Sequence, residues 1–166
     1  MLKEIVRYPL KIKGVSSSEF TEIKSPYSGE VIGAVAQADE KAIKQAIAVA
    51  QETFEKVMSK MPAHERSQIL RKTSQAIADN LEDFAQTIAL EGGKPIKDAR
   101  VEASRAVNTF AIAAEEALRL EGEQIPMDRL PGNEGRVALV VREPIGVIAG
   151  ITPFNFPINL VAHKVA

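Results

Sequence analysis

The chain has 166 residues, of which 45% are hydrophobic and 26% are charged, and its formal net charge is -1. This composition is ordinary for a globular protein, and the near-zero charge gives no electrostatic reason to expect nucleic acid as a partner. The sequence contains no cysteine, which excludes a disulfide framework, a thiolate metal site and a cysteine nucleophile within these residues.

Two further classes of protein are excluded. No segment approaches the roughly 20 continuous apolar residues that a membrane span needs. Charges interrupt the apolar residues between Met1 and Arg7, so this stretch does not resemble a signal peptide. His64 and His163 are the only histidines and lie far apart in the sequence, so we expect no metal site. The sequence predicts a cytoplasmic protein that does not bind membranes.

The first part of the chain predicts short strands. Residues 8–13 alternate weakly between apolar and polar side chains, and residues 20–24 alternate more clearly. Residues 25–30 carry the proline, glycine and serine that are typical of a turn. The apolar residues 31–36 follow as a third strand, so we expect a small antiparallel meander.

The next part predicts helices. Asp39 is a good N-cap for the first, and apolar residues follow it at three- and four-residue spacing. Met61 and Pro62 break that helix, and Pro62 fits the first turn of the next one, where its missing N–H is no loss. A third helix begins near Asn80 and should end at Gly93, because glycine accepts the left-handed conformation beyond a helix end.

A fourth helix is predicted from Pro95 to Glu121, with Gly122 stopping it. Its many alanines indicate close packing against another element. Residues 126–135 form a polar connection.

The C-terminal part predicts two strands and a helix. Residues 136–142 are apolar on both faces of the expected strand, which is typical of a strand that finds a partner. The apolar run 145–151 predicts a fully buried strand. The turn around Asn155 should then open a last helix, with Pro157 near its start.

Several stretches resemble the aldehyde dehydrogenase superfamily. Gly93-Lys94-Pro95 followed by Glu102 is similar to a mid-helical signature of that family, and residues 115–123 look most like its non-phosphorylating glyceraldehyde-3-phosphate and lactaldehyde branches. The other matching stretches are Ser25-Pro26-Tyr27-Ser28-Gly29-Glu30, Glu143-Pro144-Ile145-Gly146-Val147-Ile148 and Pro153-Phe154-Asn155-Phe156-Pro157.

The resemblance implies an α/β fold that is the N-terminal part of an aldehyde dehydrogenase. Residues 1–127 would form the small antiparallel strands and the layer of long helices. Residues 128–143 would form an oligomerisation arm. Residues 144–166 would form the first strand and helix of a Rossmann-like dinucleotide-binding unit, here truncated.

The resemblance also assigns candidate site residues. Asn155 stands where the family places the side-chain amide that donates to the oxyanion of the reacting aldehyde, and it also lies in the cofactor-binding stretch. A helix N-cap is the alternative role for this asparagine. Contacts to NAD or NADP would come from Ile151, Thr152, Pro153 and Phe154, although a core aromatic at a strand end is the alternative for Phe154.

Two cations on or before the fourth predicted helix are further candidates. Arg105 resembles the position that binds the substrate phosphate in the glyceraldehyde-3-phosphate branch, and a guanidinium suits phosphate or carboxylate. An unremarkable surface charge is the slightly favoured alternative. Lys94 follows two glycines and could bind an anion at a helix start, but we expect a solvated capping charge.

The implied reaction is the oxidation of a small aldehyde, phosphorylated or hydroxylated, by a homodimer or homotetramer. The family's cysteine nucleophile, its general-base glutamate and its ribose-binding lysine are absent from this sequence, so we expect a fragment of a longer enzyme that is inactive alone. A non-catalytic truncated module is one alternative. A related reductase of acyl-CoA or acyl phosphates is another.

Overall fold

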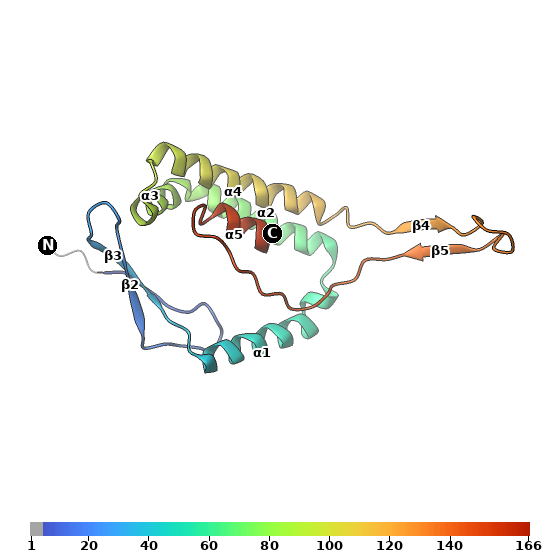
Figure 1. The fold of residues 1–166 in the computed structure, drawn as a ribbon, viewed down its shortest axis with the longest axis horizontal. Helices are drawn as coiled ribbons and strands as arrows, with labels where there is room; N and C mark the ends of the chain where they lie inside the picture. Colours follow the sequence, from blue (N-terminus) through green and yellow to red (C-terminus); the bar gives the residue numbers. More distant parts are fainter. Residues whose placement is uncertain (1–4) are drawn as a thin grey trace.

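The computed structural model describes residues 5–166, and Figure 1 shows a layer of helices, a small sheet and a hairpin that projects from one end. Residues 1–4, which belong to the stretch compared with a signal peptide, lie outside the described residues. Within the described part, none of the helices combines the length and apolar character needed to cross a membrane.

The N-terminal sheet contains β1 (Arg7–Tyr8), β2 (Phe20–Lys24) and β3 (Val31–Ala36) in the order β1-β3-β2. β2 pairs antiparallel with β3 as expected, but β1 pairs parallel with β3, so the predicted antiparallel meander is wrong at its first strand. β1 also ends well before residue 13. Pro9 follows it and has no N–H to give to a strand partner.

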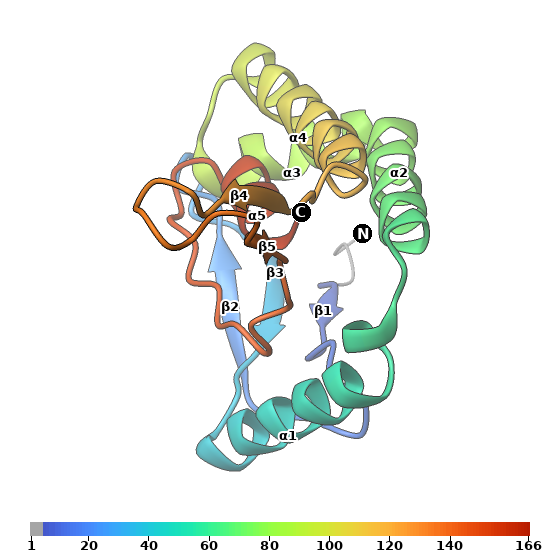
Figure 2. The same cartoon turned by 90° about the vertical axis from the view of Figure 1, so that its right-hand side faces the viewer.

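The first two helices are α1 (Glu40–Lys56) and α2 (Ala63–Asp79), with a short 3-10 turn, η1 (Met58–Lys60), between them. The Asp39 cap is confirmed, because its Oδ1 accepts the N–H of Ala42 at 2.7 Å. Pro62 is the N-cap of α2, one position before the predicted one. α1 lies away from the other helices, at the far end of the sheet in Figures 1 and 2.

α3 (Leu81–Gly92) ends as predicted, with Gly93 in the left-handed conformation at φ 64°. α4 (Ile96–Glu116) is shorter than predicted. Beyond Glu116 the backbone tightens: the N–H of Leu118 bonds the carbonyl of Glu115 at 3.1 Å, and the N–H of Arg119 bonds that of Glu116 at 2.9 Å. These i to i+3 bonds end the α-helix before Gly122 is reached.

The core lies where α4 crosses α2, α3 and α5 (Asn159–Val165). The predicted close packing of α4 is confirmed, since Ala99, Ala103, Ala106 and Ala114 are completely buried. Phe110 of α4 packs with Ala162 of α5 in this core. Small side chains on α4 let neighbouring backbones approach, and this fixes where α5 sits.

The projecting hairpin consists of β4 (Glu123–Pro126) and β5 (Val137–Val140), which pair antiparallel. The strand predicted at 136–142 is therefore confirmed over β5. β4 was missed because Glu123 and Gln124 interrupt any apolar pattern. Leu139 and Val141 are largely exposed on this hairpin.

The run 145–151 is not a buried strand in this chain, so that prediction is wrong here. Ile145, Ile148 and Ile151 are 89%, 76% and 88% exposed. A buried strand needs hydrogen-bonded neighbours, and among residues 5–166 no strand pairs with this run. The chain instead follows an extended path from the hairpin back to α4, where α5 begins at Asn159 rather than near Asn155.

Candidate functional site: the turn around Asn155

The turn Pro153–Pro157 joins the extended run 145–151 to α5 and lies beside the N-terminal half of α4. The chain bends at residues 154–156 and turns at 157–158. Each proline fixes its own φ near -65° and also restricts the residue before it. The backbone on both sides of Asn155 is therefore stiff for reasons that are local to the sequence.

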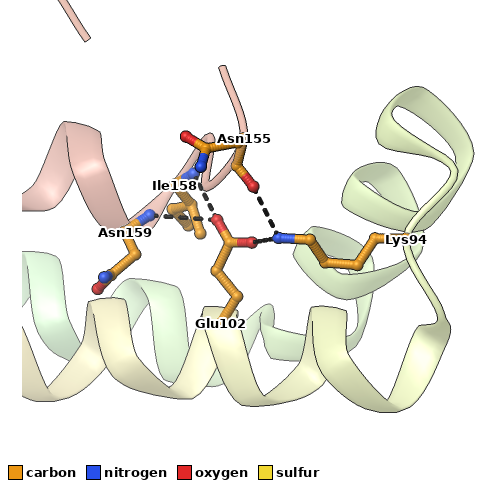
Figure 3. A network of polar contacts seen from close by, with 5 residues as sticks. All are labelled: Lys94, Glu102, Asn155, Ile158 and Asn159. Atoms are coloured by element: carbon orange, nitrogen blue, oxygen red, sulfur yellow. Dashed lines mark hydrogen bonds and ion pairs between the residues drawn. The ribbon is translucent and has the colours of Figure 1, made fainter. Parts of the chain in front are cut away.

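Two side chains from outside the turn hold its backbone (Figure 3). Glu102 of α4 accepts the N–H groups of Ile158 and Asn159 through Oε1, at 3.1 and 3.4 Å. Lys94, between α3 and α4, donates to the carbonyl oxygen of Asn155 at 3.0 Å and pairs with Oε2 of Glu102. The turn is thus bonded at residue 155 and again just after it.

Glu102 is a charged group in the protein interior. Its side chain is 1% exposed, while that of Lys94 is 18% exposed. Burying a carboxylate is costly unless it is paired and hydrogen-bonded, and both conditions are met here. In the part of the chain that the structure describes, no buried side-chain nitrogen or oxygen lacks a partner.

Asn155 itself is exposed, and its backbone carbonyl, not its amide, is the group that Lys94 holds. It is not the N-cap of α5, because that position is Ile158 and carries no side-chain cap. The helix-cap alternative is therefore wrong. The carboxylate of Glu102 performs that task from a different helix, which leaves the amide of Asn155 available to a ligand.

The candidate cofactor stretch, 151–154, is open on the surface. Ile151 and Phe154 are 88% and 94% exposed, Pro153 is exposed and Thr152 is half-buried. Phe154 is therefore not a core aromatic in this chain. Neighbouring large apolar side chains with such high exposed fractions are typical of a surface that a ligand or another part of a protein covers.

Arg105 lies on α4 beside a hollow of about 340 Å³ that Lys94, Glu102 and Phe156 also line. It is exposed, and among the described residues no ion pair to it is found. Asp98 lines the same hollow, so its charge is mixed. The structure thus places Arg105 near the Asn155 turn.

A larger hollow, of about 940 Å³, lies between the N-terminal sheet and helices α2 and α3. Its walls include Tyr8, Ile32 and Ile69, and it does not reach the Asn155 turn. Size alone therefore does not identify the site. Among residues 5–166, no three histidine, aspartate or glutamate side chains come together in a way that could hold a metal ion.

The sequence did not predict that Lys94 and Glu102 hold the Asn155 turn. Lys94 is partly buried and paired, so the prediction of a solvated capping charge is wrong. Glu102 appeared only in a family signature, without a role. The only signal for these two residues in the sequence was a lysine after a glycine pair, followed by a glutamate on the next helix. Nothing in the sequence shows that their common partner lies more than 50 residues later.

Comparison with known proteins identifies the family. The model of the aldehyde dehydrogenase family matches residues 13–166. The 3-sulfolactaldehyde dehydrogenase of Priestia megaterium is 36% identical over 165 residues, which are 98% of this chain and 34% of that protein. The chain belongs to the aldehyde dehydrogenase family, as its sequence motifs predicted.

Solved structures agree with this assignment and confirm the predicted fold. Aldehyde dehydrogenase 21 from Physcomitrella patens, in complex with the reaction product succinate, superimposes with a TM-score of 0.91 at 38% identity, over 98% of this chain and 34% of that one. The NADP-dependent glyceraldehyde-3-phosphate dehydrogenase of Bacillus halodurans C-125, complexed with NADP, gives 0.84 at 35% identity, over 90% and 31%. The chain spans about a third of the length of these relatives.

Proposed function

We propose that this chain is the N-terminal part of an enzyme that oxidises an aldehyde to a carboxylic acid with NAD or NADP. Asn155 is its oxyanion donor. One observation carries this proposal: the turn around Asn155 is fixed by prolines and by the Lys94–Glu102 pair, while its amide stays exposed. A fixed donor of this kind is what stabilises charge that develops during a reaction.

The chemistry of this proposal is that of the aldehyde dehydrogenase family. A thiolate adds to the aldehyde carbon, forming a carbon–sulfur bond, and the carbonyl oxygen becomes negative. The amide N–H of Asn155 donates to this oxygen. Loss of hydride from the same carbon and cleavage of the carbon–sulfur bond by water then give the carboxylic acid and return the thiolate. The chain has no cysteine, so the thiolate comes from another part of the complete protein. The 166-residue chain alone is therefore inactive.

The stretch 151–154 is the part of this chain that would hold the cofactor. The exposed side chains of Ile151 and Phe154 fit an aromatic ligand, and the backbone beside them has no strand partner among the described residues. A nicotinamide dinucleotide, when bound, supplies the hydride acceptor of the oxidation. NADP is present in one of the related structures, which supports this class of cofactor.

The substrate class is a small aldehyde that carries a phosphate or a hydroxyl group. Arg105 lines the hollow next to the Asn155 turn, and a guanidinium can pair with an anion through two hydrogen bonds. The named substrates of the sulfolactaldehyde and glyceraldehyde-3-phosphate relatives are of this kind.

The exposed apolar side chains of the proposed arm support an oligomer. Residues 1–127 supply the sheet and helices, residues 128–143 the arm, and residues 144–166 the start of the dinucleotide-binding unit. The arm leaves Leu139 and Val141 exposed, which supports its pairing with another subunit in a homodimer or homotetramer. A cytoplasmic location stays a prediction from the sequence.

Replacement of Asn155 tests the proposal. In the complete protein, Asn155→Ala should lower kcat for aldehyde oxidation roughly 10²- to 10³-fold, the usual effect of removing one oxyanion donor. The dissociation constant for NAD or NADP should stay the same, because the amide acts on the developing charge. Asn108→Ala, at an exposed position of α4, is the matched control.

Steady-state kinetics and a cofactor titration give both quantities. An unchanged kcat in Asn155→Ala would overturn the assignment of Asn155. Formation of NADH or NADPH by the 166-residue chain alone would contradict the proposal that the nucleophile lies elsewhere.

A further inference from the structure

We propose that Lys94 and Glu102 are positioning residues for the oxyanion donor. They hold the backbone of the Asn155 turn and thereby keep the side-chain amide of Asn155 in a fixed position. This inference rests on the proposed function of Asn155. Neither residue is assigned a contact with the reacting atoms. Both act through the turn.

Glu102 holds the C-terminal side of the turn. Its Oε1 accepts the N–H groups of Ile158 and Asn159, which would otherwise have no side-chain partner because the N-cap of α5 is an isoleucine. A carboxylate at a helix start also interacts favourably with the helix dipole. Since Glu102 projects from α4, these bonds fix α5, and the turn before it, to the core of the molecule.

Lys94 holds the residue that carries the donor amide. Its Nζ donates to the carbonyl oxygen of Asn155 at 3.0 Å and lies 4.0 Å from the centre of the Phe156 ring. The ion pair with Oε2 of Glu102 sets the direction of the lysine side chain. Two consecutive residues of the turn are thus held by one ammonium group.

The groups that hold the turn are different from the side-chain amide that is proposed to bind the oxyanion. All the contacts described for Lys94 and Glu102 go to backbone groups of residues 155, 158 and 159, to the Phe156 ring and to each other. The side-chain amide of Asn155 takes no part in them.

A double variant isolates the contact with Asn155. Lys94→Met alone would leave Glu102 as an unpaired buried carboxylate and could prevent folding. Combining it with Glu102→Gln removes both charges together. The glutamine keeps an oxygen that can accept the N–H groups of Ile158 and Asn159, so the main loss is the bond to the Asn155 carbonyl. Lys97→Met, at an exposed position in the first turn of α4, is the matched control.

In the complete protein, the double variant should lower kcat about 10- to 100-fold, because a misplacement of about 1 Å at a reacting group can cost that much. KM for the cofactor should change little. Hydrogen–deuterium exchange of peptides covering residues 152–160 should become faster in the double variant. The Lys97→Met protein should match the parent in both measurements.

Adding Asn155→Ala decides between positioning and general stability. If the pair acts through Asn155, the double variant should lower kcat no further once the amide is gone. Full additivity of the two effects would overturn the inference, and so would an unchanged kcat in a double variant with faster exchange. If Asn155→Ala itself leaves kcat unchanged, the proposed function fails first, and the two failures are thereby distinguished.

Discussion

At the scale of single residues, Glu82 and Arg100 form an exposed pair that joins α3 to α4. Arg100 donates to both carboxylate oxygens of Glu82, at 2.8 and 2.7 Å. This hydrogen bonding holds the pKa of Glu82 below its ordinary value of 4.5 and raises the pKa of Arg100. A carboxyl group with a lowered pKa stabilises the fold above its unfolded pKa, and this contribution is lost as the pH falls through the folded pKa.

Arg100→Gln should therefore raise the pKa of Glu82 towards its ordinary value, because the hydrogen bonds that favour the carboxylate are removed. A titration of the Glu82 carboxyl followed by NMR measures this. Arg119→Gln is the control, since Arg119 pairs with Glu116 instead, and it should leave Glu82 unchanged. An equal pKa for Glu82 with and without Arg100 would contradict the assigned cause.

Residue types at the site were predictable only in part. Two prolines and an apolar run mark the turn around Asn155 in the sequence, but the role predicted for Asn155 came from the family resemblance. Lys94 was misjudged, since a lysine after glycines is usually solvated. Its burial depends on Phe156 and Glu102, which meet it only in three dimensions.

At the scale of elements, Gly122 allows the β4–β5 hairpin to begin directly after it. It was predicted to end the fourth helix, but α4 ends at Glu116 and Gly122 lies directly before β4. A Cβ atom at Gly122 would come within 2.1 Å of the carbonyl oxygen of Val140. Glycine is needed there for close approach between the two chain segments.

Gly122→Ala should weaken the β4–β5 pairing, because no heavy-atom contact of 2.1 Å between these groups can persist. Faster amide exchange in β4 and β5 would show this. Gly92→Ala is the matched control: nothing lies within 4 Å of its Cβ position, and alanine favours a helix by roughly 0.5–1 kcal/mol over glycine. Unaltered exchange in the hairpin of Gly122→Ala would refute the role assigned to Gly122.

Elements with local causes were predicted well. The Asp39 cap and the Gly93 helix end each depend on neighbours in the sequence. The parallel pairing of β1 and the unpaired run 145–151 were not, because strand pairing is decided by which other strands are present. An apolar run predicts burial but does not supply the partner that buries it.

At the scale of the whole molecule, the chain has a well-packed centre and large uncovered apolar surfaces. The centre is the contact of α4 with α2, α3 and α5. The uncovered surfaces lie on the projecting hairpin and on the run 145–151, where Leu139, Ile145 and Ile148 are each at least three-quarters exposed. These surfaces fit a chain that matches only about a third of its relatives' length.

Replacing Leu139 and Val141 with lysine should reduce self-association of the complete protein, because charged side chains on an exposed edge strand oppose pairing with another subunit. Light scattering coupled to gel filtration measures the mass in solution. Glu123→Lys, a polar position of the same hairpin, is the control and should leave the mass unchanged. A double-lysine variant with the parent's mass would contradict the arm assignment.

The anchoring of the Asn155 turn by Lys94 and Glu102 also bears on the order in which the protein is made. Both anchors, and the helix that carries Glu102, come before the turn in the sequence. Domains fold largely from the N-terminus during synthesis. The described contacts that hold the Asn155 turn all lie between residues 94 and 159, so a growing chain can form them as soon as the start of α5 has been made.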